Sequence, residues 1–70
     1  MTRVRMRQFL RIPDGEYDLV QFDEDGHWVV RDEHGDVFSE EHDSPRKVVE
    51  VQLPDGRWVD SNEEEALNTL

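Results

Sequence analysis

Residues 3–12 have the sequence RVRMRQFLRI, in which hydrophobic and charged side chains alternate with a period of two. One face of the alternation carries Val4, Met6, Gln8, Leu10 and Ile12. The other face carries Arg3, Arg5, Arg7, Phe9 and Arg11. A period of two is typical of a β-strand with one buried face. We therefore expect a strand over residues 3–12, with Leu10 directed inward and Phe9 among the arginines.

The remainder of the chain repeats this pattern in shorter segments that are separated by turn signals. We expect further strands near residues 16–22, 27–32, 37–39, 47–53 and 57–60. Pro-Asp-Gly at 13–15 and at 54–56, and Asp-Gly at 25–26, mark turns between them, and Asp-Gly suits the primed two-residue hairpin turns. Ser61 followed by Glu64 fits a capping box, which predicts a helix near residues 62–70.

Five or six short strands with tight turns indicate a mainly β fold. Our first expectation is a small antiparallel SH3-like barrel with a short C-terminal helix, and the alternative is a curled sheet with that helix packed across one face. Residues 1–70 are enough for a single small domain. Leu, Ile, Val and Phe make up 18 of the 70 residues, which is above the ~20% below which disorder is expected.

The formal net charge of −10 excludes an attraction of the whole surface to nucleic acid or to anionic lipid. This charge is unevenly distributed, because residues 1–12 carry +4 and residues 13–70 carry −14. The chain has no cysteine for a disulfide or a thiolate zinc site. No apolar stretch approaches the ~18 residues of a membrane span, and no signal-peptide segment follows Met1, so we expect a cytoplasmic protein.

The arginine-rich face of the first segment is the first candidate binding surface. An aromatic side chain beside arginines is a plausible anchor for a protein partner, and the residues concerned are Arg5, Arg7, Phe9 and Arg11. The alternative is that these arginines face acidic residues on a neighbouring strand, where each cross-strand pair contributes roughly 0.2–1 kcal/mol.

The acidic turns are the second candidate surface. The predicted partner-binding carboxylates are Asp23, Glu24, Asp25, Asp32, Glu33, Asp36, Glu40 and Glu41. They could form a solvated or salt-adapted surface, steer a basic protein, or imitate nucleic-acid phosphates as short acidic phage inhibitors of DNA- or RNA-handling enzymes do. The mimic hypothesis requires residues 23–25, 32–36 and 40–43 to form one continuous stripe.

Catalytic and metal chemistry finds little support in the sequence. Asp23 and Asp25 precede a glycine, but the Ca²⁺-loop pattern fails at its first and last positions. His27, His34 and His42 lack a helical spacing that would bring two of them together, and no nucleophile motif or glycine-rich phosphate loop is present. We therefore predict a non-enzymatic module without metal or cofactor that binds another protein, as a monomer or a homodimer, and makes no direct contact with nucleic acid or membrane. The alternatives are a nucleic-acid mimic that inhibits a DNA- or RNA-handling enzyme and a salt-adapted structural or assembly protein.

Overall fold

The computed structural model describes residues 1–23, 25–41 and 46–70. It confirms the mainly β fold, with six antiparallel strands in one sheet and a short C-terminal helix. The elements are β1 (Arg3–Arg7), β2 (Gly15–Phe22), β3 (Trp28–Arg31), β4 (Val37–Glu40), β5 (Val48–Gln52), β6 (Trp58–Asp60) and α1 (Glu64–Thr69). The strand order is β4-β3-β2-β1-β5-β6, so the sheet is not closed and β4 and β6 form its edges.

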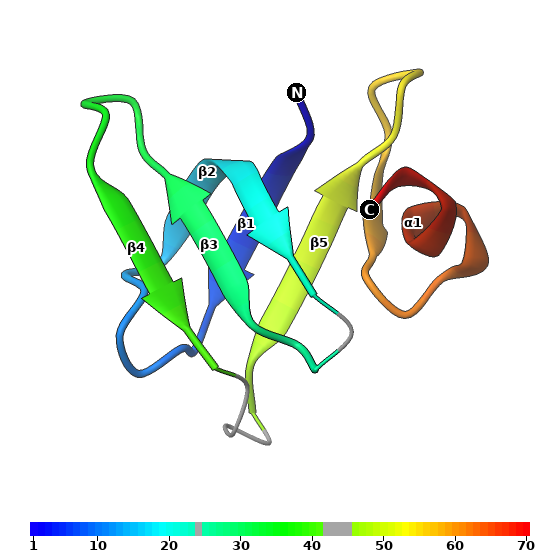
Figure 1. Ribbon diagram of the computed structural model, residues 1–70. Coiled ribbons are helices and arrows are strands. Elements are labelled where there is room, and N and C mark those ends of the chain that lie inside the picture. The colour runs from blue at the N-terminus through cyan, green and yellow to red at the C-terminus, as the bar shows by residue number, and fades with distance from the viewer. Residues whose placement is uncertain (24, 42–45) are drawn as a thin grey trace.

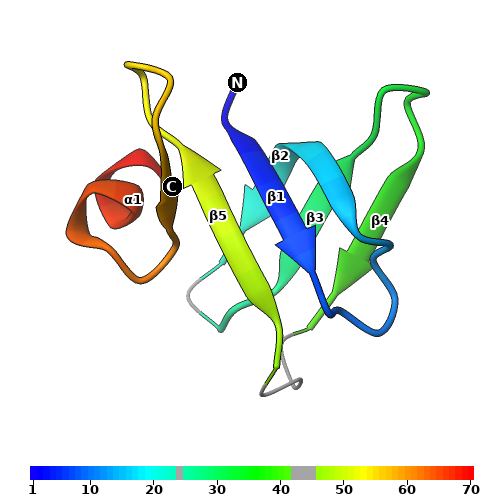
Figure 2. The same ribbon diagram turned by 180° about the vertical axis from the view of Figure 1, so that it is seen from behind.

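The sheet curls around its hydrophobic core. In Figure 1, β3 and β4 lie in front of β1 and β5, and the reverse view of Figure 2 brings β1 and β5 to the front. The helix α1 packs against β5 and β6 at one side of the molecule. The inward-facing side chains of the sheet are Val4, Met6, Tyr17, Trp28, Val30, Val49 and Val51, all at most 4% exposed. No helix within the described residues is long and apolar enough to cross a membrane.

The first strand is shorter than the alternation predicts. β1 ends at Arg7, because Gln8 has a φ of +64° and takes the chain out of the extended conformation. Beyond this point Phe9 turns inward and is 9% exposed, whereas Leu10 turns outward and is 85% exposed. The faces predicted for Phe9 and Leu10 were therefore wrong, although Ile12 is buried as expected.

Three hairpin loops share one hydrogen-bond pattern, which joins residues 23, 26 and 27, residues 32, 35 and 36, and residues 53, 56 and 57. In each loop the N–H of the glycine donates to the C=O of the first residue, and the first N–H donates to the C=O of the fifth. The φ angles of Gly26, Gly35 and Gly56 are +82°, +85° and +94°. These are three-residue loops with glycine in the left-handed region, not the two-residue primed turns that Asp-Gly indicated.

The helix begins later than predicted and without the expected capping box. α1 starts at Glu64, its N-cap is Glu63, and no side chain caps it. The Ser61 N–H instead donates to the Val49 carbonyl at 2.9 Å, and the Asp60 carboxylate accepts the Asn62 N–H at 2.9 Å. The Ser61 bond thus ties the segment after β6 to β5.

Candidate functional site

The arginines of β1 face acidic residues on both neighbouring strands. The register places Arg3 opposite Asp18, and it places Arg5 between Glu16 on β2 and Glu50 on β5. Arg3 contacts Asp18 at 3.0 Å, and Arg5 contacts Glu16 at 3.8 Å. Pairing of the arginines across strands, the alternative to a free basic surface, is confirmed for these residues.

Two further contacts occupy the same face. Arg7 lies 3.8 Å from Glu50. The guanidinium carbon of Arg5 lies 3.9 Å from the centroid of the Trp58 ring, a favourable cation–π geometry. A depression in front of this face is lined by two arginines that pair with Glu16 and Glu50, and by Asp14, which accepts the Gln8 N–H. This surface therefore offers little uncompensated charge to a partner.

The predicted Phe9 anchor is not exposed. Phe9 belongs to the buried core cluster, and the amino group of Lys47 lies 6.0 Å from its ring centroid. Arg11 is exposed in the following loop, but it has no exposed aromatic neighbour at position 9. An anchor formed by Phe9 with Arg5, Arg7 and Arg11 is therefore wrong in its central residue.

Glu40 holds the loop that contains Phe9. The Glu40 side chain is 7% exposed, and its carboxylate accepts hydrogen bonds from the backbone N–H of Leu10, at 3.2 Å, and of Arg11. The loop is also held at its ends, because the Gln8 N–H donates to Asp14 and the Tyr17 hydroxyl donates to the Pro13 carbonyl. Glu40 is consequently a structural carboxylate and not part of an exposed acidic surface.

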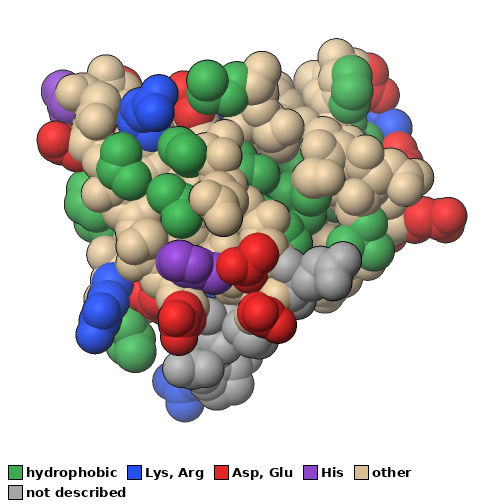
Figure 3. Space-filling view, in the orientation of Figure 1, with side chains coloured by type: hydrophobic (Ala, Val, Ile, Leu, Met, Phe, Trp, Pro, Cys, Tyr) green, Lys and Arg blue, Asp and Glu red, His purple; other side chains and the backbone are tan. Residues whose placement is uncertain are grey.

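Among the described residues, the acidic turns do not form the continuous stripe that the mimic hypothesis requires. β3 runs from the turn at 23–27 to the turn at 32–36, so these turns lie at opposite ends of the strand. Glu41 follows the end of β4 that pairs with Trp28, at the end of the sheet near the first turn. On the face shown in Figure 3, the acidic side chains form separate groups and no continuous band.

Several of the turn carboxylates bind the backbone of their own turns. Asp23 accepts the N–H groups of Asp25 and His27 at 3.1 and 3.0 Å. Asp32 accepts those of His34 and Asp36, both at 2.9 Å. Asp25, Glu33 and Asp36 are exposed, and the predicted site at Glu24 lies outside the described residues, as do residues 42–43 of the stripe that the mimic hypothesis requires.

Replacing Asp32 with alanine should lower the free energy of unfolding by about 1–2 kcal/mol, because two backbone hydrogen bonds of the turn are lost. Asp32→Asn retains an acceptor oxygen and should recover most of this loss. Glu33→Ala is the matched control, since the Glu33 side chain is 86% exposed, and it should stay within about 0.5 kcal/mol of the unmodified protein. Urea denaturation measures all three variants, and an unchanged midpoint for Asp32→Ala would contradict the structural role of this carboxylate.

The histidines do not converge on a common site in the described part of the chain. His27 lies 3.8 Å from Asp23 and His34 lies 3.6 Å from Glu33, in turns at opposite ends of β3. Within residues 1–23, 25–41 and 46–70, no three His, Asp or Glu side chains are arranged to hold a metal ion. His42 lies outside these residues.

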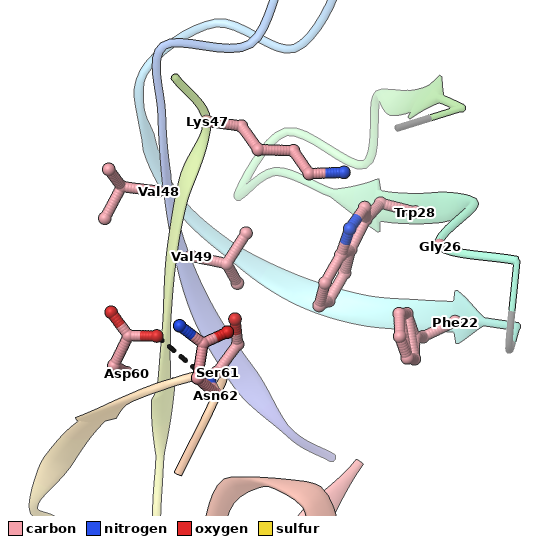
Figure 4. A pocket seen from close by; sticks show the side chains of 9 residues that line it. All are labelled: Phe22, Gly26, Trp28, Lys47, Val48, Val49, Asp60, Ser61 and Asn62. Atoms are coloured by element: carbon pink, nitrogen blue, oxygen red, sulfur yellow. Dashed lines mark hydrogen bonds between the residues drawn. The ribbon is translucent and has the colours of Figure 1, made fainter. Parts of the chain in front are cut away.

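A pocket of about 250 Å³ opens between the ends of β2, β3 and β5 and the segment that follows β6. Figure 4 shows Phe22 and Trp28 on one wall, Asp60 and Asn62 on the opposite wall, and Val49 between them. The Phe22 and Trp28 rings have centroids 4.3 Å apart and are tilted by 36°. This pair follows from the register, because Phe22 and Trp28 are directly opposed on β2 and β3.

The polar groups of the pocket carry opposite charges. Lys47 extends along its upper wall in Figure 4, and burial lowers the pKa of this amino group while the nearby Glu40 carboxylate partly offsets the effect. Asp60 lies on the opposite wall, and Asp23 and Asp25 belong to the turn that contributes Gly26 to the lining. The lining therefore combines an apolar floor with one amine and one carboxylate, and the turn beside it adds the carboxylates of Asp23 and Asp25.

None of the residues that line the pocket was among the predicted site residues. Phe22 and Trp28 flank an acidic turn that the sequence marks as a hairpin, so their proximity is a local feature. Val49 and Asn62 lie more than twenty residues beyond Trp28 along the chain. Only the pairing of β1 with both β2 and β5 brings these segments together. No protein-family model, curated protein or solved structure matches the chain.

Proposed function

We propose that this protein is a non-enzymatic interaction module that binds a basic segment of another protein. The observation that carries the proposal is the pocket of Figure 4, in which two tilted aromatic side chains and Val49 meet a rim containing Asp60 and Lys47. The pocket accepts one apolar side chain of the partner, and the carboxylates around it attract the flanking lysines or arginines.

The size of the pocket favours a side chain over a free metabolite. Its volume of about 250 Å³ is smaller than the roughly 300–1,000 Å³ of typical small-molecule sites. Burying one apolar side chain contributes about 1.5–3 kcal/mol. This is only part of the binding free energy of a protein complex, so the pocket anchors a larger interface. The net charge of −10 adds long-range attraction for a basic partner.

The nucleic-acid mimic hypothesis has less support from the geometry. It depends on regularly spaced carboxylates along one surface, but the two acidic turns lie at opposite ends of β3 and Glu40 is buried. We therefore favour binding of a basic protein.

The proposal is tested first by photo-crosslinking in the native host. A photoreactive residue at position 62, on the exposed rim of the pocket, should capture a partner that the same residue at position 33, on the distant turn, does not. The captured protein is then purified and titrated with the unmodified module.

Asn62→Trp should weaken the affinity for that purified partner by about 10- to 100-fold, because the indole fills the mouth of the pocket and excludes one apolar side chain. Glu33→Trp is the matched control and should bind normally. Both positions are exposed, so thermal unfolding should be almost unchanged in either variant. Equal affinity of the Asn62→Trp variant and the unmodified protein, measured by calorimetry, would reject the pocket as the binding site.

A further inference from the structure

The outer edge of β4 is a second surface, independent of the pocket, that the proposed function does not use. β4 pairs with β3 through Val37–Arg31, Phe38–Val30, Ser39–Val29 and Glu40–Trp28. In the part of the chain that the structure describes, no strand pairs with its other side. Figure 1 shows β4 at the outer side of the sheet, far from α1.

The turn at 32–36 determines which backbone groups of β4 face outward. The Asp32 N–H donates to the Asp36 carbonyl at 2.9 Å. Directly opposed residues of an antiparallel pair alternate between hydrogen-bonded and non-hydrogen-bonded positions. Phe38 and Glu40 therefore exchange bonds with β3, and the N–H and C=O groups of Val37 and Ser39 are directed to the free edge.

The free edge lacks the usual protection against strand pairing. Natural edges are protected by lysine, proline, a bulge or a covering element, but residues 37–40 have the sequence Val-Phe-Ser-Glu and an unbroken register with β3. The opposite edge, β6, has three residues and lies beside α1. The short length of β4 and the inward-pointing carboxylate of Glu40 are the protective features that it retains, so it is still the more open edge of the sheet.

The surroundings of β4 favour one kind of occupant. Val37 is 55% exposed, and Leu10, whose N–H donates to Glu40 at the other end of the strand, is 85% exposed. Exposed carboxylates flank the strand, with Asp36 before it and Glu41 after it. A second copy of this chain, also at −10, would bring like charges together.

We infer that the free edge of β4 binds an extended, basic segment of another protein by strand addition. The partner strand forms backbone hydrogen bonds with Val37 and Ser39, places apolar side chains beside Val37 and Leu10, and directs lysine or arginine toward Asp36 and Glu41. Main-chain bonds supply the attraction and the alternating side chains supply the selectivity in this mode of recognition.

The test uses a ten-residue peptide of alternating lysine and valine, titrated into the ¹⁵N-labelled protein. We expect the largest amide shifts along β4, and hydrogen exchange slowed at least about tenfold at the N–H groups of Val37 and Ser39. The same peptide with every backbone nitrogen methylated should not bind, because neither of its edges can then donate hydrogen bonds to the ladder. A glutamate–valine peptide should also fail to bind, because the strand is flanked by carboxylates.

Ser39→Pro supplies the matching change in the protein. Proline removes an N–H directed to the free edge and leaves the bonds to β3 intact, so the peptide should bind about tenfold more weakly or not at all. Ser39→Ala should bind normally, and so should Asn62→Trp, which separates this surface from the pocket.

Three results would overturn the inference. These are equal binding of the methylated peptide to the unmodified protein, loss of peptide binding in the Asn62→Trp variant, and dimerisation of the protein alone through β4 in sedimentation experiments. The methylated peptide needs no protein variant, so the test does not depend on the folding of Ser39→Pro.

Discussion

Replacing Phe9 with alanine is expected to lower the free energy of unfolding by about 3–4 kcal/mol, because a large core side chain is deleted and a cavity remains. Phe9 is 9% exposed and packs in the buried cluster of the sheet. This loss is a large part of the total stability of a domain of this size, which is roughly 5 kcal/mol. Phe9→Leu, a milder change, should cost about 1 kcal/mol and keeps the comparison measurable if the alanine variant unfolds.

Leu10→Ala is the decisive control for this prediction. The simple alternation of residues 3–12 places Leu10 in the core and Phe9 outside, whereas the structure exchanges them. Because Leu10 is 85% exposed, its replacement should change the free energy of unfolding by less than about 0.5 kcal/mol. A larger loss for Leu10→Ala than for Phe9→Ala, in urea denaturation monitored by tryptophan fluorescence, would show that the strand continues through Gln8.

Replacing Glu40 with alanine is expected to lower the free energy of unfolding by about 2–4 kcal/mol. The buried carboxylate accepts the N–H groups of Leu10 and Arg11, and each hydrogen bond to a charged group contributes about 1.5–3 kcal/mol. Partial access of water to the exposed loop keeps the total below the sum of two such bonds. The 8–14 loop should lose its order before the sheet does, since its central anchor is removed.

Two further variants test whether the effect depends on the negative charge of Glu40 and whether it is specific to position 40. Glu40→Gln retains one acceptor oxygen and should lose about half as much stability as the alanine variant. Glu41→Ala, at the exposed neighbouring position, should be close to neutral. If Glu40→Ala and Glu41→Ala had the same midpoint of unfolding, Glu40 would be an ordinary surface acid. Amide hydrogen exchange at Leu10 and Arg11 reports directly whether the loop has been released.

These two predictions concern the same segment for a physical reason. The 8–14 loop contains almost no backbone pairing with the sheet, so side chains must hold it. Phe9 and Ile12 hold it by burial, Glu40 holds it by two hydrogen bonds, and the Tyr17 hydroxyl holds it through the Pro13 carbonyl. Burial raises the pKa of Tyr17, and the carboxylates of Asp32 and Asp14 add to this effect.

The sequence by itself determined the features that depend on local pattern. Period-two alternation, together with short apolar runs between turn signals, located all six strands to within a few residues, except for the end of the first. Glycine located the turns, because few other residues adopt a positive φ at low cost. The sequence also offered cross-strand pairing of the first-strand arginines as an alternative, but the partners of Arg3 and Arg5 depend on the strand order, which it left open.

Only the tertiary structure decided the features that depend on contacts between distant segments. Gln8 adopts a positive φ that its side chain does not favour, and it does so where burial of Phe9 and the bonds from Glu40, thirty residues away, hold the loop in place. The same holds for the pocket, whose walls come from β2, β3, β5 and the segment after β6. Local propensity does not predict such contacts, because they form, and contribute to stability, only after the strands have paired.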